Sequence, residues 1–212
     1  MAKEKSKSSQ ARLFVALDLP EALRNGIVAW GRRELGDQAF RLMPAESLHI
    51  TLAFLGYLPE KEVGRLAKIV TSLTGPAPVI TLGDPVAKPT LKRARLIVLP
   101  VKSSGVVALQ AELEEALVAK ELYDPEKRPF WPHVTVARVR YKGRNTKRPG
   151  PGFQLTSQVS APLGRPQRSD RCSLYRSELK PQGAQYTPLA RVELFKSHRR
   201  GGEHGRQKGG FE

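Results

Sequence analysis

Two short segments of this chain repeat one alternating pattern, which constrains the fold more than any other feature of the sequence. Leu48 to Gly56 (LHITLAFLG) and Pro132 to Arg138 (PHVTVAR) each carry a histidine and, two positions later, a threonine. Side chains alternate between the two faces of a β-strand, so each histidine shares a face with its threonine while the other face is apolar. The pattern predicts two half-buried strands whose histidines, 84 positions apart (133 − 49), can meet in one site.

The remaining periodicity predicts a mixed fold in which strands outnumber helices. Leu109, Leu113 and Leu117 recur at helical spacing, and two prolines precede further helical patterns. Helices are predicted over about 20–36, 59–75 and 106–121, and further strands near 12–19, 79–82, 94–99, 153–159, 172–179 and 190–195. Most of the strands are joined by loops, which predicts an α+β fold with largely antiparallel sheets. Residues 11–196 are expected to form a single domain between a disordered basic arm (1–10) and a disordered basic tail (197–212).

The composition restricts the class of protein and the class of partner. The chain has 40% hydrophobic and 26% charged residues, which is typical of a soluble globular protein. Its apolar runs are too short to span a membrane, and its first ten residues resemble no secretory signal. The single cysteine, Cys172, excludes an internal disulfide and a zinc site built from several cysteines. These features predict a cytoplasmic protein.

The formal net charge is +16. Such a surplus favours a phosphate-rich ligand such as RNA or a nucleotide, because binding releases the counterions around phosphates. The alternative is that the basic termini serve solubility alone.

Two histidine–threonine pairs suit metal-free phosphodiester chemistry. Imidazole titrates near neutrality, so one ring can accept a proton while the other donates one. The hydroxyls of Thr51 and Thr135 can hydrogen-bond the phosphate oxygens and hold the phosphorus between the rings. Two histidines without a matching acidic or cysteine cluster make a poor metal site, so neither a metal nor another cofactor is expected.

The two HxTx segments resemble the paired motifs of the two-histidine phosphoesterase superfamily. Within that superfamily, the chain is more similar to the bacterial and archaeal RNA 2′,3′-cyclic phosphodiesterases, which are also called 2′-5′ RNA ligases. The flanking segments RLFVALDLP, RPFWPHVTVARV and LYRSEL, and the later YTPLARVELF, extend the resemblance over most of 12–195. It implies a bilobal α+β fold in which two antiparallel sheets, flanked by helices, surround a central cleft.

The resemblance also implies roles for individual residues. His49 would donate a proton to the leaving 3′ oxygen, and His133 would activate water to give a 2′-phosphate end, although a near-symmetric pair leaves this assignment open. Phe54 and Arg138, each five positions after a motif histidine, would contact the nucleotide. Strict alternation places both on the face opposite the histidines, so this role requires each strand to end or bulge before them.

The resulting prediction is an enzyme that hydrolyses 2′,3′-cyclic phosphate ends of RNA or oligonucleotides, acting as a monomer without a membrane partner. Three alternatives stay open. They are the reverse reaction, which joins a cyclic end to a 5′-hydroxyl, a non-catalytic RNA-binding module, and a transesterase that cleaves internal linkages. ATP-dependent ligation is not expected, because the chain has no GxxxxGK[ST] phosphate loop.

Overall fold

A computed structural model describes residues 9–36, 40–139, 158, 159, 161–181 and 183–195. Its strands are β1 (Gln10–Asp18), β2 (Phe40–Leu42), β3 (His49–Pro59), β4 (Val79–Leu82), β5 (Val86–Lys88), β6 (Leu96–Lys102), β7 (His133–Val139), β8 (Gln167–Arg168), β9 (Arg171–Lys180) and β10 (Gly183–Glu193). The α-helices are α1 (Glu21–Glu34), α2 (Val63–Thr71) and α3 (Ser104–Val118), and three single 3₁₀ turns are η1 (Ala45–Ser47), η2 (Glu60–Glu62) and η3 (Leu91–Arg93). The expected tail, nearly all of the expected arm and most of the strand predicted near 153–159 lie outside the described residues.

The strands form a ten-stranded sheet in the order β10-β9-β1-β3-β7-β6-β4-β8, with β2 on β7 and β5 on β6. The pairings between these strands are antiparallel, as the sequence predicted. Strands β3 and β7 pair at Ile50 and Val134, and this contact joins the two expected sheets into one. The first half of the sheet (β10, β9, β1 and β3) and the second half (β7, β6, β4 and β8, with β2 and β5) therefore meet where the two motif strands pair.

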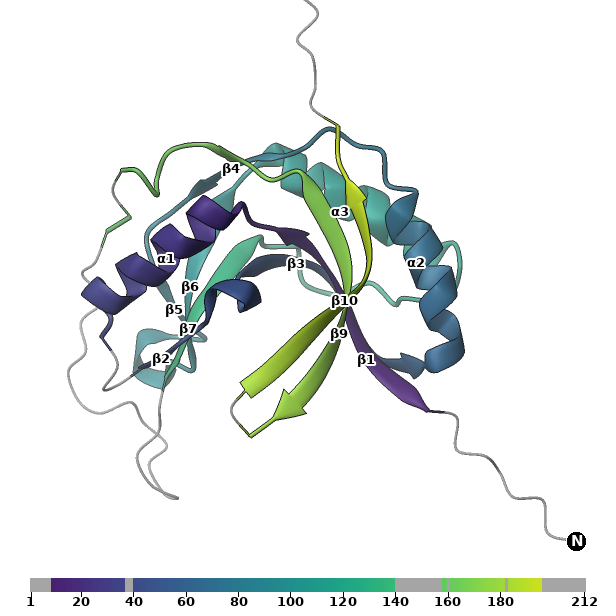
Figure 1. The fold of residues 1–212 in the computed structure, drawn as a ribbon, viewed down its shortest axis with the longest axis horizontal. Coiled ribbons are helices and arrows are strands. Elements are labelled where there is room, and N and C mark those ends of the chain that lie inside the picture. The colour runs from purple at the N-terminus through teal and green to yellow at the C-terminus, as the bar shows by residue number, and fades with distance from the viewer. Residues whose placement is uncertain (1–8, 37–39, 140–157, 160, 182, 196–212) are drawn as a thin grey trace, which may run out of the picture.

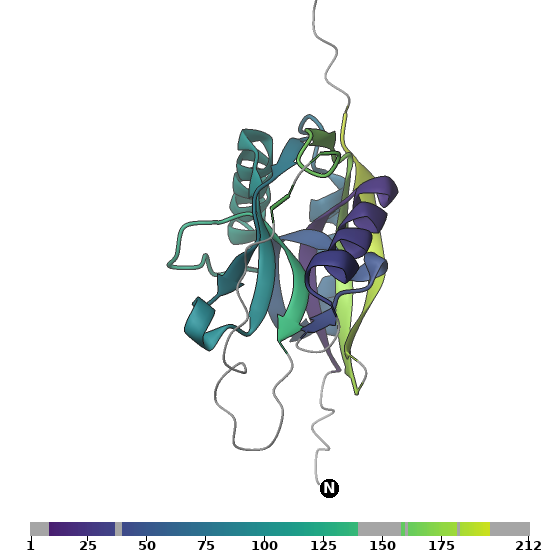
Figure 2. The ribbon, with the colours of Figure 1, turned by 90° about the vertical axis from the view of Figure 1, so that its left-hand side faces the viewer.

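Two of the helices cover one half each, and the third spans both. Helix α2 packs on β9 and β10 of the first half, α1 packs on β2 and β7 of the second half, and α3 packs on α2, on β3 and on β4. Figure 1 shows α1 beside the labels of β5, β6 and β7, with α2 and α3 over the other side. In the view turned by 90°, the teal strands of the second half lie on one side of the molecule and the yellow-green β9 and β10 lie on the other (Figure 2).

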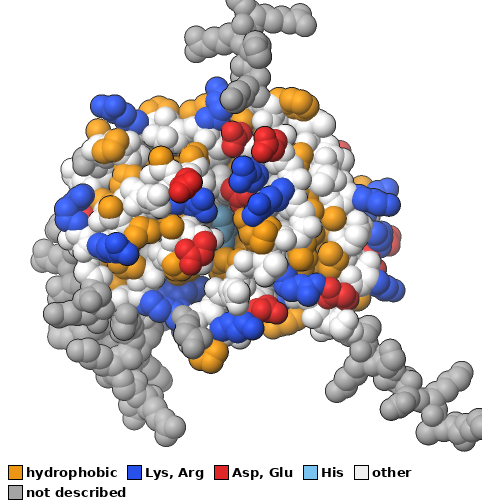
Figure 3. Space-filling view, viewed as in Figure 1, with side chains coloured by type: hydrophobic (Ala, Val, Ile, Leu, Met, Phe, Trp, Pro, Cys, Tyr) orange, Lys and Arg blue, Asp and Glu red, His pale blue; other side chains and the backbone are white. Residues whose placement is uncertain are grey.

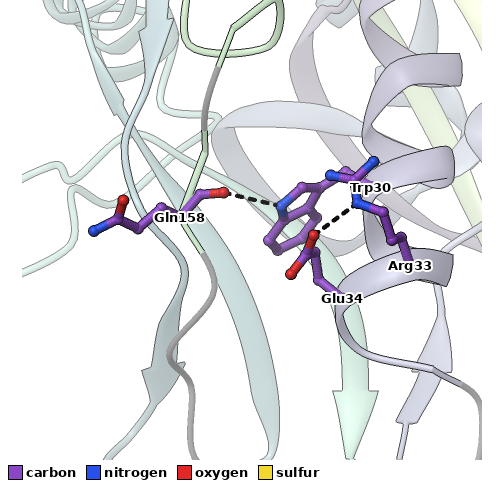
Figure 4. Close-up of polar contacts among 4 residues, drawn as sticks. All are labelled: Trp30, Arg33, Glu34 and Gln158. Carbon is purple, nitrogen blue, oxygen red and sulfur yellow. Dashed lines mark hydrogen bonds and ion pairs between the residues drawn. The ribbon is translucent and has the colours of Figure 1, made fainter.

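The helices form close to where the apolar spacing predicted them, except that α2 is shorter than the predicted 59–75, because Pro59 ends β3 and a 3₁₀ turn precedes the helix. Leu23, Ile27 and Trp30 are the buried side of α1. Helix α3 begins after Ser103, whose side chain accepts a hydrogen bond from the backbone N–H of Val106 (3.2 Å), an N-cap that satisfies one of the free donors of the first turn. The indole N–H of Trp30 also donates to the backbone carbonyl of Gln158 (3.3 Å), so α1 is tied to a segment 128 positions away (Figure 4).

Strand β10 is longer than predicted. It begins at Gly183, whereas the sequence predicted a strand only from residue 190. Its pairing with β9 shifts register between Pro188 and Ala190, and this bulge interrupts the alternation on which the prediction relied. A proline is tolerated here because β10 lies at the edge of the sheet.

Candidate active site

The two motif strands place their histidines and threonines on one face of the sheet. β3 begins at His49 and β7 at His133, and both read half-buried, buried, half-buried, buried, buried, exposed from the histidine onward. Because the strands are antiparallel and pair one residue after each histidine, Thr51 lies on the side of His133 and Thr135 on the side of His49. The four side chains form a site with approximate two-fold symmetry.

A β-bulge in β3 turns Phe54 toward the face of the histidines. Thr51 and Ala53 lie opposite neighbouring residues of β1, so Leu52 between them has no partner. Phe54 then lies opposite Phe14, on the same face as Thr51. Its side chain is 43% exposed.

Strand β7 contains the same bulge at the same position. Thr135 and Ala137 lie opposite neighbouring residues of β6, so Val136 is the extra residue. Arg138 lies opposite Leu96, two residues along β6 from the partner of Thr135, and therefore shares its face. The bulges that a substrate contact by Phe54 and Arg138 requires are thus present in both strands.

His49 is enclosed by aromatic rings from the first half of the sheet. Phe14 stacks on its ring (centroids 4.9 Å apart) and Tyr186 meets it edge-on (5.4 Å). Burial lowers the pKa of His49 to about 4, a hydrogen bond with the backbone of Ser47 partly opposes this shift, and the nearby charge of His133 adds to it. Burial disfavours the charged ring, so His49 is neutral at pH 7.

His133 has a different environment, formed by the residue two positions before it. Its Nδ1 donates to the backbone carbonyl of Trp131 (2.9 Å), which leaves Nε2 for proton transfer. The indole of Trp131 also stacks on the imidazole, with centroids 5.0 Å apart. On Trp131, in turn, the ammonium of Lys88 lies 4.0 Å from the ring centroid.

A hydrogen-bonded carboxylate supports the aromatic side of the site. Asp18, which lies opposite His49 in the β1–β3 pairing, accepts hydrogen bonds from Ser173 (2.8 Å) and from the hydroxyl of Tyr175 (2.7 Å). Burial, together with the charge of Asp18, raises the pKa of Tyr175 to about 12. The Tyr175 ring stacks on Phe14 (5.2 Å), so this hydrogen bond holds the ring stack beside His49.

Histidine surface lies in a hollow near the centre of the face seen in Figure 3, with basic, acidic and apolar side chains around it. Within the described residues, no group of three His, Cys, Asp or Glu side chains could hold a metal ion. The sequence pattern alone did not indicate the contributions of Asp18, Phe14, Lys88 and Trp131.

Removing Tyr186 is expected to raise the pKa of His49. Tyr186→Ala admits water beside the ring, which restores solvation of the imidazolium and moves the pKa from about 4 toward the ordinary value of about 6.5. Proton NMR titration of the histidine ring protons measures the shift, with His49→Ala assigning the resonance. Tyr57→Ala is the matched control. Tyr57 lies on β3, as His49 does, but its side chain is 60% exposed, so its removal should leave the pKa of His49 near 4. An unchanged His49 in Tyr186→Ala would show that the aromatic enclosure does not set its pKa.

Comparison with known families supplies the context for this geometry. Residues 19–142 match the family described as the 2′-5′ RNA ligase superfamily. The chain is 30% identical over 189 residues to the RNA 2′,3′-cyclic phosphodiesterase of Escherichia coli (strain K12), covering 88% of this chain and 98% of that protein. It is 31% identical over 213 residues to the protein of the same name from Thermus thermophilus, covering 93% and 94%.

Solved structures share the fold over the same length. The crystal structure of TT0787 of Thermus thermophilus superposes with a TM-score of 0.73 and 28% identity, covering 88% of this chain and all of that one. Escherichia coli LigT complexed with phosphate has a TM-score of 0.68 and 25% identity, covering 89% of this chain and all of that one.

Proposed function

The chain belongs to the 2′-5′ RNA ligase superfamily, and on that premise we propose that it hydrolyses 2′,3′-cyclic phosphate ends of RNA without a metal ion. The observation that carries the proposal is the arrangement of the two histidines. His49 and His133 lie on one face, each hydrogen-bonded to the backbone two residues before it and each accompanied by a threonine. Both rings are thereby oriented before substrate arrives, as acid–base catalysis requires.

In the proposed reaction the cyclic phosphate lies between the two rings. One imidazole takes a proton from water, whose oxygen attacks phosphorus, and the other gives a proton to the 3′ oxygen as the P–O3′ bond breaks. The product carries a 2′-phosphate and a 3′-hydroxyl. The hydroxyls of Thr51 and Thr135 donate to the phosphate oxygens as charge develops on them, while Phe54 stacks on the base and Arg138 contacts the nucleotide.

The environment of His49 bears on which histidine plays which role. The family resemblance implies that His49 is the proton donor. With a pKa of about 4, however, His49 is unprotonated at pH 7, and it can donate a proton only if the bound phosphate anion first raises that pKa. We therefore propose His49, which starts without a proton, as the base and His133 as the donor; a bound phosphate anion would also make His49 a stronger base by raising its pKa.

Hydrolysis is favoured over the reverse, joining reaction because water is in vast excess over any RNA 5′-hydroxyl.

No helix among the described residues is long and apolar enough to cross a membrane. A monomeric state and a cytoplasmic location are part of the proposal.

The direct test uses purified protein, EDTA, and two substrates: a 2′,3′-cyclic mononucleotide and a short RNA that ends in a cyclic phosphate. We expect a 2′-phosphate product in both reactions, at a rate that EDTA does not change. Inhibition by EDTA that a divalent ion reverses would contradict the metal-free mechanism. Salt-sensitive RNA binding without turnover would support a binding module, while 2′-5′-joined RNA or cleavage of internal linkages would support the other two alternatives.

A further inference from the structure

Three cationic residues lie at one level across four strands of the second half of the sheet. Arg41 of β2 lies opposite Arg138 of β7, Arg138 lies opposite Leu96 of β6, and Leu96 lies opposite Lys88 of β5. Residues directly opposite each other in a sheet share a face, so all four share the face of His133 and Thr135. We call Arg41, Arg138 and Lys88 the cationic row.

The cationic row contains two guanidinium groups on neighbouring strands. Arg41 and Arg138 are direct cross-strand neighbours, so their side chains start from adjacent positions on one face of the sheet. Neither Arg138 nor Lys88 takes part in an ion pair with a carboxylate among the described residues. Arg138 and Lys88 therefore present positive charge that is suited to an anion.

Arg41 also connects the two halves of the site. The guanidinium of Arg41 lies beside Gly183 at the start of β10: its Nη1 is 3.5 Å from the position that a Cβ on Gly183 would occupy. The half-buried Arg41 side chain therefore extends from β2 in the second half to the β9–β10 hairpin of the first. A guanidinium at this position can reach a ligand that lies between the two halves.

The spacing along the strand separates Arg138 from the reacting phosphate, whereas the ammonium of Lys88 extends toward Trp131 beside His133. His133 lies opposite Pro100, and Arg138 lies opposite Leu96, four residues or roughly 13 Å further along β6. Aromatic rings line the first half of the site, where Phe14, Phe54 and Tyr186 share a face, whereas the cationic row lies on the second half. A base stacked on the aromatic side would leave the backbone of the same strand free to follow the cationic row.

We propose that the cationic row binds the phosphate on the 5′ side of the terminal nucleotide, so that the site takes RNA chain ends in preference to mononucleotides. This inference rests on the proposed function, because it assumes that the 2′ or cyclic phosphate occupies the space between the histidines. It adds Arg41 and Lys88 to the substrate contacts and gives the site two phosphate positions, one reacting and one recognised.

Equilibrium binding of product-like ligands tests this inference without relying on turnover. The two probes are adenosine 2′-monophosphate and adenosine 2′,5′-bisphosphate, which differ by one phosphate, and isothermal calorimetry at low salt gives their Kd values. We expect the bisphosphate to bind about tenfold more tightly, as one charge-assisted phosphate contact provides. Arg41→Met should bring the two Kd values to within about twofold, whereas Arg41→Lys should keep part of the preference.

Controls separate a site from general charge. Arg33→Met removes one charge from the outer helix α1, where Arg33 pairs with Glu34, and should leave the preference unchanged. Lys88→Met, on a separate strand, should reduce it. Three results would overturn the inference. The unmodified protein could bind the two probes equally, it could bind neither probe, or Arg33→Met and Arg41→Met could lose the preference for the bisphosphate to the same extent. Absent turnover of cyclic phosphates would instead count against the proposed function, and the binding ratio would still be measured.

Discussion

Replacing either His49 or His133 with alanine is expected to lower kcat for opening a 2′,3′-cyclic phosphate by about 10²–10⁴-fold, the usual contribution of a general acid or base. Both rings are half-buried on the face of the sheet that carries the site, outside the fully buried core, so the fold should survive and circular dichroism should be unchanged. His204→Ala is the matched control, since His204 has no proposed role. Near-normal kcat in either site variant would refute the paired acid–base mechanism.

The same two variants identify which histidine donates the proton. A nucleotide phosphodiester with a nitrophenolate leaving group needs no general acid, because nitrophenolate departs without a proton. The variant that lacks the donor should therefore recover much of its activity on this substrate, while the variant that lacks the base should not. The low pKa of His49 predicts recovery in His133→Ala, whereas recovery in His49→Ala would restore the order that the family resemblance implies.

The largest expected effect on stability is that of Trp30→Ala. Trp30 is only 2% exposed, its indole N–H donates to Gln158, and its helix α1 packs on β7. Truncating a buried tryptophan leaves a cavity and should lower the free energy of unfolding by about 3–5 kcal/mol. Urea unfolding followed by circular dichroism measures the change as a lower midpoint with an unchanged slope.

Trp131→Ala is the matched control for this measurement, because Trp131 is 40% exposed and should have a much smaller effect on stability. The transition in Trp30→Ala should remain single, since α1 follows a strand of the first half but packs on the second. Two separate transitions would contradict the proposal that residues 11–196 form one cooperative domain.

The repeated motif allowed the centre of this molecule to be predicted. Alternation identified β3 and β7 and the shared face of each histidine–threonine pair, and helical spacing identified the buried side of α1. Strands β2, β5 and β8 were missed because segments of two or three residues are too short to show a period. Their neighbours in the sheet, rather than their own residues, determine that they are strands.

The face of Phe54 and Arg138 shows where strict alternation fails. Alternation alone placed both side chains behind the sheet, and the structure turns them to the front through the bulges at Leu52 and Val136. The sequence held a signal for this. In both copies two consecutive apolar residues follow the threonine, Leu52-Ala53 and Val136-Ala137, and such a pair breaks the alternation where the extra residue is inserted.

The surroundings of the site could not be predicted from local pattern. Phe14 and Asp18 come from β1 and Tyr186 comes from β10, two strands that lie near the site only in the folded sheet. The cationic row joins β2, β5 and β7 through pairings that no periodicity encodes. Register between distant strands is set by how the whole apolar face packs. The sequence therefore indicated the proposed reacting groups, and the fold supplied their environment.

The strand order has a consequence for dividing the chain. β1 and β3 lie between β9 on one side and β7 on the other, and both of these flanking strands come from the C-terminal part of the chain. A cut in the connection between α2 and β4 would therefore place His49 on one fragment and His133 on the other. Neither fragment could complete the sheet alone, because the N-terminal one would lack both neighbours of its strands and the C-terminal one would have a gap between β9 and β7. Activity would return only when the two fragments associate, so this fold is suited to a split-enzyme reporter of fragment association.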